Sequence, residues 1–160
     1  MITVKIVSAL QLLKEGKYLA LNDLIYQVYD LTDWITKDYP NHFKHYYTKY
    51  IPELFNGERE ILTSYTGVKI EGLCILKKSE QKVCTLFVRE EARGQHLATR
   101  LLSEAFIYLG TTKPLITIAE YKVPQFTGLI KKYGWEHTQT LDASYYGNAR
   151  EFVFNGTMTP

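Results

Sequence analysis

The chain has 160 residues, 46% hydrophobic and 22% charged, which is typical of one compact unit and long enough to bury about two-thirds of the unfolded surface. Its formal net charge of +2 is too small to demand a nucleic acid partner, because nucleic-acid-binding domains usually carry a concentrated basic face. No apolar run reaches the roughly 18 residues that span a bilayer, and the first residues lack the pattern of a secretion signal. We therefore expect a single cytoplasmic domain over residues 1–160, with neither a membrane nor a nucleic acid as partner.

The first third of the chain predicts one strand and three helices. Residues 2–7 read as a strand, and Ser8 begins a capping-box pattern that opens a short helix. Apolar residues at helical spacing predict a second helix over about residues 21–34. Asn41 is a suitable N-cap for a third helix, which Pro52 should kink or divide.

The rest of the chain predicts mostly strands. Three strand-like runs joined by short polar turns indicate an antiparallel meander, and they cover residues 60–65, 68–76 and 82–88. A helix that begins near residues 94–96, a buried strand over 114–119, a helix from Pro124 to Tyr133 and a hairpin formed by 135–141 and 150–154 follow. This order predicts an α+β fold with one mixed sheet of six or seven strands and helices on both faces.

The two cysteines, Cys74 and Cys84, lie on runs that we expect to be adjacent strands. A cross-strand disulfide is geometrically conceivable, but a reducing compartment and apolar neighbours favour two buried free thiols. Two cysteines this far apart do not make a zinc site, so we expect no metal.

The junction between residues 83 and 102 is the most informative part of the sequence. Residues 83–88 are almost continuously apolar, as in a central strand, and helical spacing begins at Leu97 after a polar turn. The first N–H groups of a helix have no intrahelical partner and favour an anion. Gly94 lets a ligand approach the backbone closely, and Arg93 can bind a phosphate oxygen. The junction therefore predicts a pyrophosphate site, although one glycine is too few for a P-loop or a dinucleotide fingerprint.

Residues 93–98, Arg-Gly-Gln-His-Leu-Ala, resemble the Q/R-x-x-G-x-G/A signature of the GNAT N-acetyltransferases, with His96 where the middle glycine is usual. The leucine pair at 101–102 follows at the expected distance. Residues 133–135, Tyr-Gly-Trp, resemble the step that ends the fourth helix of that fold. With the order of elements, the resemblance covers about residues 2–154. It implies a GNAT-like, mixed and mostly antiparallel sheet with a splayed central pair of parallel strands.

The resemblance also implies acetyl-CoA as a cosubstrate. Its pantetheine arm would lie between residues 83–88 and 115–119, with a backbone N–H near Val88 polarising the thioester carbonyl, and residues 95–99 would cradle the pyrophosphate. The cofactor-binding residues predicted in this way are Leu86, Phe87, Val88, Arg93, Gly94, Gln95, His96, Leu97, Ala98 and Thr99.

The activity implied is direct attack by a primary amine of a small molecule, peptide or protein on the acetyl carbon. The alternative is a GNAT-fold binding or regulatory module with weak or absent catalysis, suggested by His96 and by Ile130, which stands where many members carry a tyrosine acid. A third option is a toxin-like enzyme acting on aminoacyl-tRNA. Its one hint is the aromatic and basic segment 41–50, which an amphipathic helix with buried tyrosines explains better. A homodimer is compatible with this fold.

Catalysis needs a base or a water chain, because deprotonating a lysine-like amine at pH 7 costs roughly 4 to 5 kcal/mol. We assign Glu120 as base and Tyr121 as acid, since both follow the splayed strand directly, although two solvated loop residues would give the same pattern. Other candidates are Glu71, from the sheet, and Tyr145 and Tyr146, in the last hairpin loop. We expect Tyr133 to be a packed aromatic and His96 to be exposed or in contact with phosphate.

Overall fold

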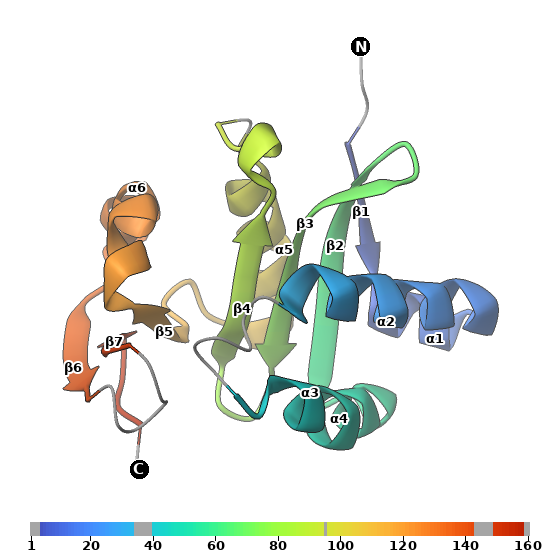
Figure 1. Cartoon of the computed structure of the whole chain (residues 1–160), viewed down its shortest axis with the longest axis horizontal. Helices are drawn as coiled ribbons and strands as arrows, with labels where there is room; N and C mark the ends of the chain where they lie inside the picture. The colour runs from blue at the N-terminus through green and yellow to red at the C-terminus, as the bar shows by residue number, and fades with distance from the viewer. Residues whose placement is uncertain (1–3, 34–39, 95, 143–148, 159–160) are drawn as a thin grey trace.

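The computed structural model describes residues 4–33, 40–94, 96–142 and 149–158. Its centre is one seven-stranded sheet in the order β1-β2-β3-β4-β5-β7-β6 (Figure 1). Every neighbouring pair is antiparallel except β4 and β5, which are parallel. The predicted mixed sheet is confirmed, with the larger of the two expected strand numbers. The strands are β1 (Val4–Ser8), β2 (Arg59–Thr66), β3 (Lys69–Lys77), β4 (Lys82–Val88), β5 (Leu115–Ala119), β6 (His137–Leu141) and β7 (Glu151–Phe154).

Helices cover both faces of the sheet, as expected. One face carries α1 (Ala9–Lys14), α2 (Tyr18–Thr32), α3 (His42–His45), the wide turn η2 (Tyr46–Tyr50) and α4 (Ile51–Phe55). The opposite face carries α5 (Leu97–Leu109) and α6 (Val123–Tyr133), so that α2 lies in front of the sheet and α5 behind it in Figure 1. Two single turns, η3 (Glu90–Ala92) and η4 (Glu120–Lys122), follow β4 and β5. Within the described ranges, no helix has the length and apolar run needed to cross a bilayer.

Local chemistry fixes the predicted helix boundaries. The Oγ of Ser8 accepts a hydrogen bond from the Gln11 N–H at 3.1 Å and so caps α1. Gly134 ends α6 with a φ of +66°, a conformation that glycine adopts without strain. The third predicted helix is divided, as expected from Pro52, because proline has no N–H to continue the hydrogen-bond ladder. The division takes the form of the wide turn η2, immediately before α4.

The tyrosines of segment 41–50 pack inward while Phe43 is exposed, which confirms the amphipathic interpretation with buried tyrosines. Tyr46 is fully buried, and its hydroxyl donates to the Ile25 carbonyl oxygen at 2.6 Å. Its ring and those of His42 and Tyr47 surround Tyr29, with centroids 5.3 to 5.7 Å from the Tyr29 centroid. Burial raises the pKa of Tyr46 and lowers that of His42.

Both cysteines are free thiols, as predicted, but only one of them is buried. Cys74 faces Leu86 across the β3–β4 pair, and burial raises its pKa. Cys84 is half-buried, which corrects the prediction of two buried thiols. The prediction missed a partner from β2, since Arg59 Nη1 donates to the Cys84 Sγ at 3.0 Å.

Close packing between α5 and the sheet depends on a glycine in β3. A Cβ at Gly72 would lie 3.0 Å from Ser64 Oγ, 3.1 Å from Leu101 Cδ1 and 3.2 Å from the Phe87 carbonyl oxygen. The last of these is backbone and cannot move aside. A side chain at this position would therefore push α5 away from the sheet.

We predict that Gly72→Ala lowers the free energy of unfolding by about 1 to 3 kcal/mol, because the added methyl group overpacks this contact. Gly128→Ala is the matched control, since no heavy atom lies within 4 Å of a Cβ built there in α6. That variant should be about 0.5 to 1 kcal/mol more stable than the parent. Urea denaturation measures both, and equal midpoints for the two variants would contradict the packing argument.

Candidate functional site

The parallel strands β4 and β5 separate almost as soon as they pair. Their register holds only Lys82 opposite Leu115 and Val83 opposite Ile116. Beyond these pairs β5 stays bonded to β7, and Figure 1 shows β5, β6, β7 and α6 diverging from the rest of the sheet. In the described part of the chain, no strand lies against the remaining edge of β4. The splayed pair predicted from the sequence is therefore present.

The open edge of β4 presents the backbone of alternate residues. Arg89 N–H donates to the Glu71 carbonyl oxygen of β3 at 2.8 Å, which fixes the direction of the backbone at the end of β4. Because successive residues of a strand direct their amides to opposite sides, Leu86 and Val88 face the gap toward β5 and Phe87 faces β3. The side of β4 that a ligand can reach is thus offered by Leu86 and Val88.

A cleft of about 880 Å³ runs from this edge over the following turn to α6. Every described residue that the sequence predicted to bind a cofactor lines the cleft. Gln95 lies outside the described residues. The predicted residues in the wall are Leu86, Phe87, Val88, Arg93, Gly94, His96, Leu97, Ala98 and Thr99.

Two arginines in the turn between β4 and α5 donate hydrogen bonds to backbone carbonyl oxygens of the sheet. Arg89 Nε donates to the Ile70 carbonyl oxygen at 2.6 Å, and Arg93 Nε donates to the Val88 carbonyl oxygen at 3.1 Å. Gly94 has a φ of +82°, and a Cβ built there has no heavy atom within 4 Å. The backbone at Gly94 therefore borders open space, as a close-approach site for a ligand requires.

The start of α5 is a donor site for an anion. The first N–H groups of a helix have no intrahelical acceptor, and no described side chain caps this one. Leu97, Ala98 and Thr99 of its first turn line the cleft. His96 is exposed, as expected, and has a left-handed φ of +61°. Glycine enters this region freely, and histidine is among the few other residues that do so readily. His96 therefore holds a left-handed backbone conformation at the position where the GNAT signature usually has its middle glycine.

The far wall of the cleft comes from α6, which the sequence analysis did not include in the site. None of the side chains of α6 is fully buried, and Gly128 in its middle leaves room on the cleft side. A glycine in the interior of an exposed helix is the signal that could have indicated this wall. The residues that this region adds are Lys122, Gln125, Phe126, Gly128, Leu129 and Lys132.

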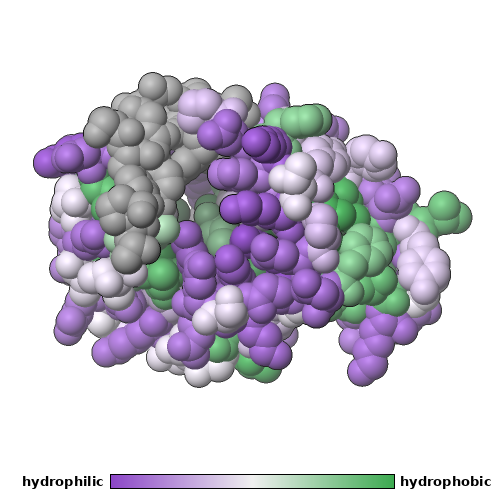
Figure 2. Space-filling model, turned by 90° about the horizontal axis from the view of Figure 1, so that it is seen from below, coloured by the Kyte–Doolittle hydropathy of each residue, from purple (hydrophilic) through white to green (hydrophobic). Residues whose placement is uncertain are grey.

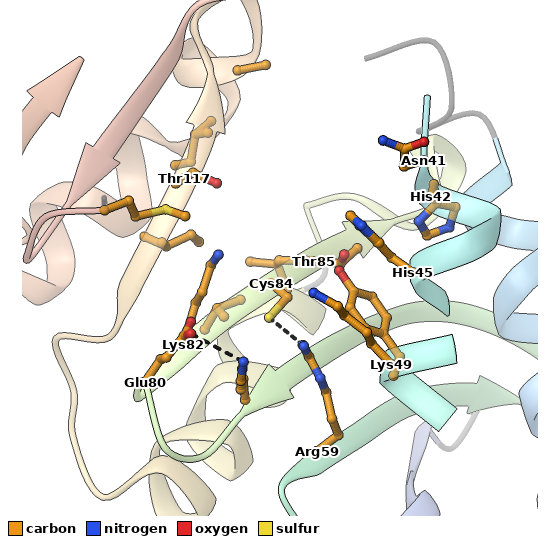
Figure 3. A pocket seen from close by; sticks show the side chains of 18 of the residues that line it. Asn41, His42, His45, Lys49, Arg59, Glu80, Lys82, Cys84, Thr85 and Thr117 are labelled. Carbon is orange, nitrogen blue, oxygen red and sulfur yellow. Dashed lines mark hydrogen bonds and ion pairs between the residues drawn. The ribbon is translucent and has the colours of Figure 1, made fainter. Parts of the chain in front are cut away.

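A second cavity, of about 560 Å³, lies between the two strands and the α3–η2 segment. It shares Leu86, Lys122 and Phe126 with the cleft, so the two spaces meet where β4 and β5 part. Figure 3 shows its polar side chains, and Figure 2 shows hydrophilic residues gathered around a hollow on the underside of the molecule. The α3–η2 segment forms one wall with Asn41, His42, His45, Lys49 and Tyr50.

A buried arginine organises the floor of the second cavity. Arg59 is 4% exposed, and its Nε donates to Glu53 Oε2 at 2.8 Å while its guanidinium lies 4.1 Å from the centroid of the Tyr50 ring. Partial burial lowers the pKa of His45, and the charges of Lys49, Lys44 and Arg59 lower it further.

The two residues predicted as acid and base lie directly after β5, as expected, but in neither cavity wall. Glu120 forms an ion pair with Arg150, and its N–H donates to the Arg150 carbonyl oxygen at 2.8 Å. Tyr121 is half-exposed, and its ring lies 5.4 Å from Lys122 Nζ. Their catalytic roles stay predictions. The other candidates Tyr145 and Tyr146 lie outside the described residues.

The remaining candidates are held by the core. Tyr133 contacts Phe106 edge-on, with ring centroids 5.0 Å apart, and stacks on Trp135 at 5.8 Å, so it is the packed aromatic that was expected. Ile130, a residue of α6, is partly buried against the hydrophobic core on the α5 face of the sheet. Glu71 lines neither cavity, and its Oε2 is buried without a hydrogen-bond partner among the described residues.

Comparison by sequence finds no relative: no protein-family model matches the chain, and no curated protein matches it. Comparison by structure finds several. Nourseothricin acetyltransferase superposes with a TM-score of 0.53 at 13% identity, over 62% of this chain and 65% of its own, and thus over less than two thirds of its own length. A predicted streptothricin acetyltransferase from Bacillus anthracis str. Ames, in complex with acetyl-CoA, gives 0.54 at 14% identity over 67% of each chain.

A third solved structure is a GNAT family acetyltransferase from Elizabethkingia anophelis with acetyl-CoA bound. It has a TM-score of 0.50 at 15% identity and is matched over 67% of this chain and 81% of its own. At such low identities the likeness concerns the fold. The chain therefore has the GNAT fold, as the resemblance in residues 93–98 implied.

Proposed function

We propose that this protein is an acetyl-CoA-dependent N-acetyltransferase that acts on a primary amine. One observation carries the proposal: the open edge of β4 leads without a break into the uncapped start of α5 and, at the parting of the strands, into a second cavity. This is the arrangement that a long, anionic thioester and a separate acceptor require. The acetyl-CoA bound in two of the solved structures with this fold supports the same assignment.

The residues of the cleft suit acetyl-CoA. Its pantetheine amides would hydrogen-bond the backbone of Leu86 and Val88, and its pyrophosphate would accept from the first N–H groups of α5. Among the described residues of the wall, the three cations Arg93, Lys122 and Lys132 outnumber the one carboxylate, Glu90, which suits a polyanionic ligand. When bound, acetyl-CoA supplies a thioester carbonyl that a neutral amine can attack.

In the proposed reaction the amine nitrogen forms a C–N bond to the acetyl carbon while the C–S bond breaks. The electron pair of that bond leaves with the coenzyme A sulfur, which takes up a proton. The Val88 region of the β4 edge would donate to the carbonyl oxygen as it gains charge. The amine proton passes to a base, for which Glu120 is the proposed residue, with Tyr121 as the proposed acid.

Titration calorimetry with acetyl-CoA tests the cofactor site. We predict micromolar binding, weakened roughly 10- to 100-fold in Arg93→Ala by the loss of a charge-assisted hydrogen bond, and abolished in Gly94→Trp, whose side chain would fill the cleft. Thr99→Glu, which places an anion beside the start of α5, should also weaken binding without altering the turn.

The control for this titration is Lys5→Gln, on the exposed edge strand β1 far from the cleft. Urea denaturation of each variant separates lost binding from lost folding. Equal affinity for acetyl-CoA in all four variants, or no binding to the parent at millimolar acetyl-CoA, would contradict the proposal. Either result would favour a GNAT scaffold recruited for partner binding.

A pair of variants tests Glu120 as the base. We expect Glu120→Gln to lower kcat by about 10²- to 10⁴-fold, because the proton acceptor is lost. Arg150→Met breaks the same ion pair but leaves the carboxylate, so its kcat should stay within about tenfold of the parent. Thiol release from acetyl-CoA measures both. Similar losses in the two variants would show that Glu120 has only a structural role.

A further inference from the structure

Positive charge dominates the second cavity. If its histidines are not counted, the described wall contains five cationic side chains and one carboxylate, that of Glu80. These cations come from η2, β2, β3, β4 and the turn after β5, so they are separate in the sequence and meet only in the folded chain. They are Lys49, Arg59, Lys77, Lys82 and Lys122.

Ion pairs neutralise some of these cations and leave others. Arg59 pairs with Glu53 at 2.8 Å, and Lys77 pairs with Glu80 at 3.2 Å. No described carboxylate forms an ion pair with Lys49 or Lys82. The cavity therefore holds two lysines whose charge is not balanced by a described residue.

These two lysines face the cavity from opposite walls. Lys49 extends from η2, and Lys82 from the start of β4, where its pairing with β5 begins (Figure 3). Lys82 is half-buried, so its charge is screened less than that of a surface lysine. An anionic group between the two walls would be attracted by both.

The same charges affect a bound amine in two ways. They repel a second ammonium group, so a polyamine is a poor occupant of this cavity. They also disfavour protonation of a nearby amine, and the neutral amine is the form that attacks a thioester. The cavity volume of about 560 Å³ lies in the range of small-molecule sites.

We propose, resting on the acetyl transfer proposed above, that the acceptor is a small primary amine that also carries an anionic group, a carboxylate or a phosphate. Lys49 and Lys82 bind the anionic group, and the amine points to the junction with the cleft at Leu86. The lysines are specificity-determining residues, and the acceptor is not a polyamine.

Matched pairs of amines test the inference by kcat/KM. The probes are 4-aminobutyrate against butylamine for a carboxylate and O-phosphoethanolamine against ethanolamine for a phosphate, with 1,5-diaminopentane as the dication. We expect the anionic member of at least one pair to exceed its partner by about tenfold or more. Lys49→Gln and Lys82→Gln should each reduce that ratio about fivefold, which corresponds to one Coulombic contact near 4 Å in water.

Charge reversal supplies a result that a merely structural role would not give. Lys82→Glu should shift preference toward 1,5-diaminopentane, whereas Lys5→Gln should leave every ratio unchanged. Acetylation of all amines without regard to charge would overturn the inference and leave the proposed function standing. A preference for an aminoacylated RNA over every small amine would also overturn it.

A binding measurement keeps the inference testable if acetyl-CoA does not bind and the proposed function fails. Calorimetric titration of 4-aminobutyrate and O-phosphoethanolamine into the protein then decides directly whether the cavity selects anions. Binding of either, weakened in Lys82→Gln, supports the anion site. Binding no tighter than that of butylamine and ethanolamine, which lack the anionic group, overturns it.

Discussion

The brief parallel contact between β4 and β5 is the constraint on which the site depends. Backbone N–H and C=O groups in a folded chain need partners, and in most of this sheet a neighbouring strand supplies them. Two register pairs hold β5 to β4. Beyond them β5 pairs with β7 and diverges from β4. The edge of β4 at Leu86 and Val88 is left for a partner outside the sheet. A ligand with amides at the right spacing is the partner that the proposed function supplies.

In the proposed function, one face of the sheet binds acetyl-CoA and the other binds the acceptor. The face that carries α5 and α6 holds the long cleft, with an uncapped helix start for an anion and cations around it. The face that carries α3 and η2 holds the smaller cavity, where Arg59 is fixed by Glu53 and Tyr50, and Lys49 and Lys82 remain for an acceptor. Both spaces open at Leu86, so a thioester bound on one side and an amine bound on the other would meet there.

The sequence predicted the features that depend on residues close together in the chain and missed those that depend on contacts between distant residues. Strand, turn and helix between residues 83 and 102 are set by local patterns, and the described residues predicted for the cofactor all line one cleft. The α6 wall, the Arg59–Cys84 contact and the facing lysines of the second cavity were missed, because each joins elements distant in the sequence. The Glu120–Arg150 pair was missed for the same reason, since 30 residues separate its partners and only the β5–β7 pairing brings them together.

Hydrogen exchange with and without acetyl-CoA is the most direct test of the central claim that a ligand completes the edge of β4. If the claim is right, acetyl-CoA slows exchange of the Leu86 and Val88 amides and of the first amides of α5 by roughly tenfold or more, because each gains an acceptor. The amides of β1 and β2 should exchange as before. Unchanged exchange at residues 86–88 and 97–99, with acetyl-CoA bound elsewhere or not at all, would contradict the claim.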